Sequence, residues 1–289
     1  MKHHVLHRII GETALGDNLQ FEIDRKQFIG RNGSLAHPQA LFSRMPLSSR
    51  SGFSPDPILS LRTIIRLESR HTASVVFMTG FAQSAAEVQK LASSCSDLND
   101  SVEIFKNALT SSLLKMKYLS ISPKQFNAIQ EMARAIFYPA RSYRSLPEVI
   151  SQNCLGQSGL WRFGISGDLP IILLRIDSFK STQLIVDVLQ AFEFYRLNHI
   201  LVDLVILNEE SAGYFMEVRQ LIDQMTSRLR IFSSDLASIG IFVINSSQIS
   251  SEEHHLLGAV ACLTITADTG IYFRKLKAQR SEVDRAAES

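Results

Sequence analysis

The stretch GQSGLWRFGISGDLPIILL, residues 156–174, decides the fold of this chain because a glycine-rich turn leads straight into a continuous apolar run. Four of its first twelve residues are glycine, which allows positive φ angles and a close approach of the backbone to a ligand or another segment. A short apolar run after turn residues is typical of a strand buried on both faces. Trp161, the only tryptophan, is a flat apolar side chain with one donor that suits a sugar ring or a core. The stretch therefore predicts a shaped loop at the entrance to an α/β unit.

Downstream of this stretch, apolar runs alternate with amphipathic segments, which predicts parallel strands separated by helices. We expect strands at Pro170–Ile176, Val202–Asn208 and Gly240–Asn245, and helices at Ser181–Asn198, Ala212–Leu229 and Ser251–Leu263. Together they predict a small parallel three-stranded α/β module within residues 151–275, followed by a polar tail at 276–289. Right-handed crossovers place the ligand-accessible edge of such a sheet at the carboxyl ends of its strands, near Asp177, Asn208–Glu209 and Asn245–Ser246.

Upstream, residues 1–82 carry short alternating runs between glycines and prolines, a pattern typical of an antiparallel sheet or sandwich. The expected strands are residues 5–10, 19–23, 58–67 and 74–78. Residues 83–150 then follow a helical period and predict a helical linker region. The fold class is therefore mixed α+β: a partial antiparallel β-sandwich, a helical connector and a small parallel three-stranded α/β module.

Two helix starts in the connector have recognisable capping residues. Ser84 with Glu87 three residues later predicts a capping box, and Ser122–Pro123 suits an N-cap followed by proline at the first helical position. Two apolar stripes at helical spacing are expected to lie in the core. They consist of Val102, Phe105, Leu109, Leu113 and Met116, and of Phe126, Ile129, Met132, Ala133 and Ile136.

Composition excludes several function classes. A net charge of +2 over 289 residues gives no case for nucleic-acid binding, and the three cysteines match neither a metal spacing nor a disulfide framework. The chain has no apolar run long enough to span a bilayer and no secretory signal, so a reduced, cytoplasmic setting is expected. His254–His255 are expected to be solvated, and we expect no metal site and no cofactor.

Several motifs, taken in order, resemble segments of the cyclic β-1,2-glucan synthases. Residues 21–33, FEIDRKQFIGRNG, resemble the FETDRxxFLGRG element of that family. DPILSLR at 56–62, FMTG at 77–80, the glycine-rich stretch at 156–170 and VDLVILNE at 202–209 follow in the family's order. The resemblance covers roughly residues 20–270 and implies an interior segment between the glycosyltransferase part and the C-terminal cellobiose phosphorylase-like part. It also implies that residues 1–82 are the last part of a large β-sandwich.

Five residues are candidates for carbohydrate contact: Trp161, Arg162, Asp168, Asn208 and Glu209. Each also has a structural interpretation. Dense apolar neighbours predict that Trp161 packs against the helical and α/β regions, with glucan contact secondary, and Asp168 can cap backbone donors in its turn. Asp203 interrupts an apolar strand, so it needs a partner if buried, and Arg175 or Arg196 could serve.

The enzyme question depends on which elements the chain carries. Glycosidases generally use paired carboxylates, and the resemblance places the family's general acid and its nucleotide-sugar transferase motifs outside this segment. We therefore expect a non-catalytic, structural and glucan-contacting segment of a cyclic β-1,2-glucan synthase, expressed as a truncated or split gene product. The alternative is a reduced glycoside hydrolase or transferase domain that uses Asp168, Asp177 or Glu209. The expected partners are β-1,2-glucan or another glucan and the remaining parts of a split synthase, whose parent family is anchored in the bacterial inner membrane.

Overall fold

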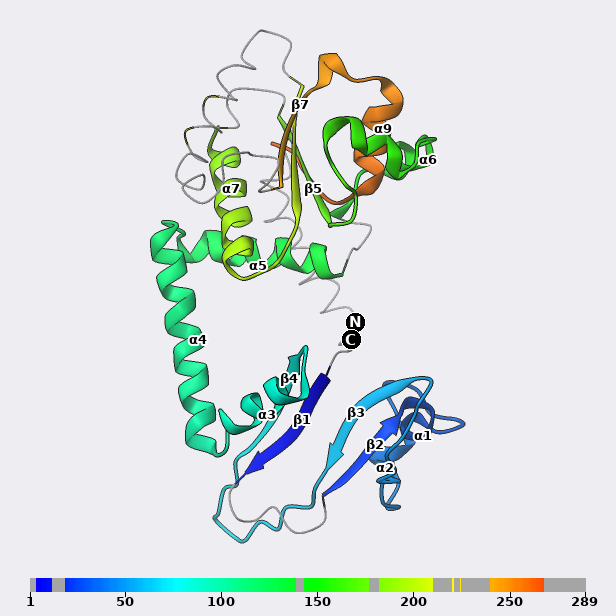
Figure 1. Ribbon diagram of the computed structural model, residues 1–289, viewed down its shortest axis with the longest axis vertical. Helices are drawn as coiled ribbons and strands as arrows, with labels where there is room; N and C mark the ends of the chain where they lie inside the picture. The colour runs from blue at the N-terminus through cyan, green and yellow to red at the C-terminus, as the bar shows by residue number, and fades with distance from the viewer. Residues whose placement is uncertain are drawn as a thin grey trace, which may run out of the picture. The chain divides into compact units, whose positions relative to one another are not determined.

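The computed structural model describes residues 4–11, 19–138, 143–176, 182–209, 220, 224 and 240–267, drawn as ribbons in Figure 1. The chain divides into two compact units, Met1–Ser111 and Ser112–Ser289. The division falls within the long helix α4, Leu98–Tyr118. The first unit contains the predicted antiparallel strands and the second contains the predicted parallel sheet.

Unit 1 is built from two antiparallel strand pairs, β1 with β4 and β2 with β3. Its elements are β1 (His4–Gly11), β2 (Gln20–Asp24), α1 (Arg25–Ile29), α2 (Gln39–Phe42), β3 (Pro57–Arg62), β4 (Val75–Ala82) and α3 (Ala85–Ser93). All four predicted strands are present. The third is shorter than expected, because β3 ends at Arg62 and Ile64 and Leu67 beyond it are exposed. The antiparallel pairing confirms the predicted fold class of this region.

Helix α3 covers one face of the β1–β4 pair. Leu91 packs on Gly80 of β4, and the Arg8 guanidinium of β1 donates to the Ala92 carbonyl at 2.8 Å. Ser84 is the N-cap of α3, as predicted, and accepts from the Glu87 amide. The Glu87 carboxylate bonds the amide of Gln83 instead of Ser84, so the reciprocal half of the predicted capping box is replaced by a neighbouring contact.

The two predicted apolar stripes differ in outcome. On α5 (Pro123–Phe137) the stripe is core, with Ile129, Met132 and Ile136 buried, and Ser122 forms a capping box with Gln125. On α4 the prediction of burial is wrong, since Phe105 and Leu109 are 70% and 61% exposed. A helical period specifies which residues share a face, but burial also needs a neighbouring surface. Within this stripe only Met116, near the end of the helix, is partly buried and packs against the core of unit 2.

Unit 2 is a parallel sheet between two helical layers, with strand order β7-β6-β5-β8. Its further elements are α6 (Pro147–Ser151), η2 (Gln157–Phe163), β5 (Ile171–Ile176), α7 (Thr182–Leu197), β6 (Asp203–Asn208), β7 (Ile241–Asn245), η6 (Ser246–Gln248), α9 (Ser251–Val260) and β8 (Ala261–Ile265). Figure 1 shows α5 and α7 on one side of the sheet, and α6 and α9 on the other. Each face has its own buried cluster. Burial on both faces explains why the strands read as continuous apolar runs.

The sheet has four described strands, one more than predicted. The expected helix Ser251–Leu263 ends at Val260, and Ala261–Ile265 forms β8, which pairs in parallel with β5. A five-residue apolar run has no period that distinguishes a strand from the last turn of a buried helix, so the helix was extended too far. The predicted helix Ala212–Leu229, the candidate Asp177 and the tail 276–289 lie outside the described residues, apart from positions 220 and 224. Over the described residues, we find no helix of the length and apolarity needed to cross a membrane.

Candidate functional site

The glycine-rich stretch forms a short 3-10 helix, η2, anchored by two buried side chains. Leu160 and Ile165 are 1% and 0% exposed and join the cluster between the sheet and α9. Gly159 allows η2 to approach α9 closely, because a Cβ there would lie 2.7 Å from Leu256 Cδ2. Gly164 ends η2 with φ 76°, a left-handed conformation that favours glycine. The predicted shaped, ordered loop is therefore present.

Trp161 does not pack as the sequence suggested. Its side chain is 64% exposed, whereas its neighbour Leu160 is buried. Successive residues of a 3-10 helix point about 120° apart, so a helix whose Leu160 faces the core turns Trp161 towards solvent. The expectation that Trp161 is a packing residue is therefore wrong. An exposed indole on an anchored helix is a surface that can stack on a sugar ring.

Arg162 is fixed between η2 and α9. Its guanidinium forms an ion pair with Glu253 and lies 5.2 Å from the centre of the Phe163 ring. The other carboxylate oxygen of Glu253 accepts from the Ser250 amide at 2.8 Å and completes the capping box of α9. Glu253 is 7% exposed, so the buried carboxylate holds the Arg162 guanidinium against α9.

Polar side chains gather at the carboxyl ends of the parallel strands, as the crossover rule predicts. Asn208 ends β6 but is fully buried, so the structure does not present this predicted contact residue to a glucan. We call the other four polar residues at this edge, Arg175, Glu209, Ser246 and His254, the carboxyl-edge cluster. The strand register pairs Ile176 with Asn208 and Asn208 with Asn245, which brings these ends together. Arg175 donates to Glu209 from Nη2 at 2.7 Å and from Nε at 3.0 Å, and both side chains are partly exposed. The pair offers donors and acceptors side by side, which is what a vicinal diol requires.

His254 belongs to this cluster, although the sequence suggested a solvated residue. Its Nε2 lies 2.7 Å from Ser246 Oγ, and its side chain is only partly exposed. Burial lowers the pKa of His254, the Glu209 carboxylate opposes that shift and the Arg175 guanidinium adds to it. The sequence signal that could have found it is its place in the first turn of a helix that directly follows the end of β7.

Asp168 lies at the opposite end of the sheet from Glu209. It precedes β5, its carboxylate accepts from Gln157 Nε2 at 3.3 Å, and its amide donates to Ser166 Oγ at 3.1 Å. A six-residue strand spans about 20 Å, whereas paired glycosidase carboxylates stand about 5–9.5 Å apart. Asp168 and Glu209 therefore cannot act together on one glycosidic bond.

Asp203 is close to Asp168 and 5% exposed at the start of β6. Burial raises the pKa of Asp203, and the charge of Asp168 raises it further. Neither proposed arginine partner bonds it, because Arg175 pairs with Glu209 and Arg196 with Glu193. The predicted pairing of Arg175 with Asp203 is wrong, because Arg175 lies at the carboxyl end of β5 and Asp203 at the amino end of β6.

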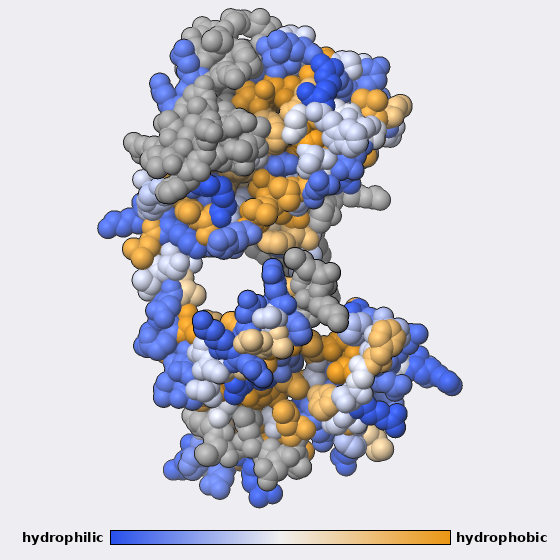
Figure 2. Space-filling model, in the orientation of Figure 1, coloured by the Kyte–Doolittle hydropathy of each residue, from blue (hydrophilic) through white to orange (hydrophobic). Residues whose placement is uncertain are grey.

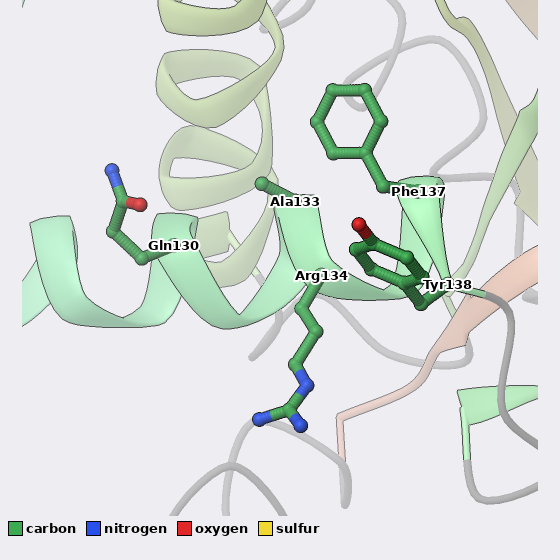
Figure 3. A pocket seen from close by; sticks show the side chains of 5 residues that line it. All are labelled: Gln130, Ala133, Arg134, Phe137 and Tyr138. Carbon is green, nitrogen blue, oxygen red and sulfur yellow. The ribbon is translucent and has the colours of Figure 1, made fainter. Parts of the chain in front are cut away.

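A metal site and a ligand cavity on α5 receive little support from the described residues. Among the described residues, no group of three or more His, Cys, Asp or Glu side chains is placed to hold a metal ion. A cavity of about 700 Å³ lies on α5, lined by Gln130, Ala133, Arg134, Phe137 and Tyr138. Figure 3 shows that the Gln130 amide and the Arg134 guanidinium point away from one another, so these polar groups do not converge on a ligand.

Comparison with known proteins gives two matches. Residues 1–98 match the family model of the glycosyl hydrolase 94 supersandwich domain. Over 231 residues, 78% of this chain, the sequence is 31% identical to the cyclic β-(1,2)-glucan synthase NdvB of Rhizobium meliloti (strain 1021), of which it spans only 8%. The antiparallel pairs of unit 1 fit the first match, and the motifs of unit 2 fall within the second. The chain is thus similar to an interior segment of a cyclic β-(1,2)-glucan synthase, and the part that matches the glycosyl hydrolase 94 supersandwich model is its first 98 residues.

Proposed function

We propose that this chain is a non-catalytic, glucan-contacting segment of a cyclic β-1,2-glucan synthase-like glycosyltransferase. The observation that carries the proposal is Trp161, which is 64% exposed on a helix anchored by the buried Leu160. Arg162, the next residue of the same helix, is held by Glu253 and keeps 58% of its side chain exposed, so it offers further hydrogen-bond donors. An aromatic face beside oriented polar groups is the usual way to bind a sugar, whose rings have apolar faces and hydroxyl edges.

The separation of the carboxylates supports a non-catalytic role. Asp168 and Glu209 lie at opposite ends of β5, and the Glu209 carboxylate is held by Arg175. Both Glu209 carboxylate oxygens already accept from the Arg175 guanidinium, which fixes the pair as a hydrogen-bonding group for hydroxyls. The carboxyl-edge cluster is therefore assigned to binding in this proposal.

A paired assay tests the proposal. The purified chain is titrated calorimetrically with β-1,2-, β-1,3- and β-1,4-gluco-oligosaccharides of equal length, and is incubated with UDP-glucose and with β-1,2-glucan. We expect saturable binding of the β-1,2 series and neither glucosyl transfer nor release of glucose. Turnover by the wild-type chain that Asp168→Asn abolishes would replace this proposal by the hydrolase or transferase alternative.

We propose the remaining parts of such a synthase as a second partner, because unit 1 exposes an apolar sheet face. Val5, Phe77 and Phe81 share the face of the β1–β4 pair opposite to α3 and are 50%, 58% and 60% exposed. Isolated two-stranded sheets are marginally stable, so a covering surface would stabilise this unit. We also propose a cytoplasmic location, since the free thiols Cys95, Cys154 and Cys262 are typical of a reducing compartment.

A further inference from the structure

A basic and apolar surface stands out in unit 1, between β2 and β3. Residues 25–55 contain five Lys and Arg residues and neither Asp nor Glu, although the whole chain carries 30 basic and 28 acidic residues. The same segment exposes five large apolar side chains: Leu35, Leu41, Phe42, Met45 and Phe53, at 78%, 67%, 70%, 73% and 94%. We call residues 25–55 the α1–α2 surface. In Figure 2 hydrophobic atoms lie beside hydrophilic ones over this part of the molecule.

The α1–α2 surface is anchored to the strands beneath it. Arg62 at the end of β3 donates to the Ala40 carbonyl at 3.0 Å and to the Met45 carbonyl at 2.6 Å. The Ser49 amide donates to the Phe21 carbonyl of β2 at 2.9 Å, and the Leu47 amide to Gln20 Oε1 at 3.1 Å. These bonds hold the backbone of residues 40–49, and the Phe42 ring stacks on His37 with the ring centres 5.8 Å apart. The exposure of Leu41, Phe42 and Met45 therefore belongs to a fixed conformation.

The charges are as exposed as the apolar groups. The exposed basic residues are Lys26, Arg31, Arg44 and Arg50. Arg25 forms an ion pair at 3.2 Å with Asp56, which lies just outside the segment. Asp24, which caps α1, and Asp56 flank the segment, whereas the charges within it are all basic. Basic groups beside exposed aromatic and aliphatic groups fit a partner that is anionic outside and apolar inside. A bilayer of anionic phospholipids has this chemistry, since basic groups bind its headgroups and apolar side chains enter the boundary with the acyl chains. An acidic protein would match the charges but would not require the five exposed apolar groups.

We propose that the α1–α2 surface binds peripherally to an anionic phospholipid membrane. The lysine and arginine side chains contact the headgroups, and Phe42 and Phe53 insert between them. This contact is separate from the glucan contact of unit 2, so either proposal can fail without the other. Binding through basic groups weakens as salt rises, because ions screen exposed charges over about 10 Å at 0.1 M.

Vesicle flotation with the full chain tests the proposal. The assay compares phosphatidylcholine vesicles with vesicles that contain about 30% of the anionic lipid phosphatidylglycerol. We expect binding to the anionic vesicles only, with loss of binding at high salt. Phe42→Ser/Phe53→Ser and Arg44→Glu/Arg50→Glu should each weaken it at least tenfold. The matched controls Phe105→Ser and Lys117→Glu change residues on α4, and Phe105 has the same 70% exposure as Phe42.

Three results would overturn the proposal. They are absence of binding to anionic vesicles, equal binding to both vesicle types, and equal loss in the α4 control variants. Circular dichroism melts of every variant show whether the fold is retained. Because the mutated side chains are exposed, we expect unchanged melting temperatures, and a variant that melts early is replaced by the single substitution Phe53→Gln or Arg50→Gln.

Discussion

Trp161→Ala and Leu160→Ala, two adjacent substitutions, should have opposite effects on stability and binding. Leu160 is 1% exposed, and removal of a buried leucine side chain costs about 3–5 kcal/mol. Trp161 is 64% exposed, so of a tryptophan's roughly 250 Å² only about 90 Å² is buried by the fold. At about 25 cal/mol per Å², with the unfolded chain already partly compact, its removal costs about 1–2 kcal/mol.

The binding effect follows from the remaining area. About 160 Å² of Trp161 faces solvent, and a sugar ring that covers one face buries about half of it, worth about 2 kcal/mol. This corresponds to a loss of about 30-fold in affinity for Trp161→Ala. Leu160→Ala should lose stability and keep its affinity at temperatures where it stays folded.

Urea unfolding and calorimetric titration with a β-1,2-gluco-oligosaccharide measure the two effects on the same samples. The reasoning would be refuted if Trp161→Ala destabilised the chain as much as Leu160→Ala, since the indole would then be a core residue. It would also be refuted if Trp161→Ala bound the oligosaccharide as tightly as the wild-type chain. Phe105→Ala, at an aromatic residue of α4 that is 70% exposed, is the control for non-specific effects.

Three further predictions concern the ionisable groups. Burial lowers the pKa of His254 below its usual 6.5, so the contribution of this residue to stability is fully present above pH 6.5 and is lost as the pH falls. The melting temperature should therefore fall less between pH 7 and 5 in His254→Gln than in the wild-type chain. The pKa of Asp203 is raised, so its contribution to stability is present below the usual pKa of 3.8 and is lost as the pH rises through the folded-state pKa. Asp203→Asn should therefore raise the melting temperature at pH 7, and an unchanged melting temperature would contradict the raised pKa. Arg175→Met should weaken oligosaccharide binding several-fold, whereas Arg196→Met, which breaks the ion pair with Glu193 on α7, should not.

The sequence was sufficient for the strands that are continuously apolar. Ile171–Ile176 and Asp203–Asn208 lie within one residue of their predicted bounds, because burial on both faces leaves few polar positions and turn residues flank each run. Ala261–Ile265 was missed because it follows α9 directly, without a turn residue between them. The fold class could therefore be predicted from local pattern, whereas the fourth strand required its pairing with β5.

The site was only partly predictable, for reasons of geometry. Composition indicated that the glycine-rich stretch was anchored, but it could not tell that Leu160 faces the core and Trp161 the solvent, because both are large and apolar. Likewise, the choice of partner for Arg175 depends on which end of β5 it occupies and on the register with β6. Contacts between residues far apart in sequence decide these points, and spacing along the chain does not encode them.

The most direct test of glucan contact uses the single tryptophan as its own reporter. Trp161 gives one indole Nε1–H signal in a ¹H–¹⁵N NMR spectrum of the intact chain, since the sequence has no other tryptophan. The account predicts that this signal shifts saturably on titration with a β-1,2-gluco-oligosaccharide, while the sugar signals show no cleavage or extension over the same period. An indole signal that stays in place at millimolar oligosaccharide, or sugar signals that change with time, would contradict it.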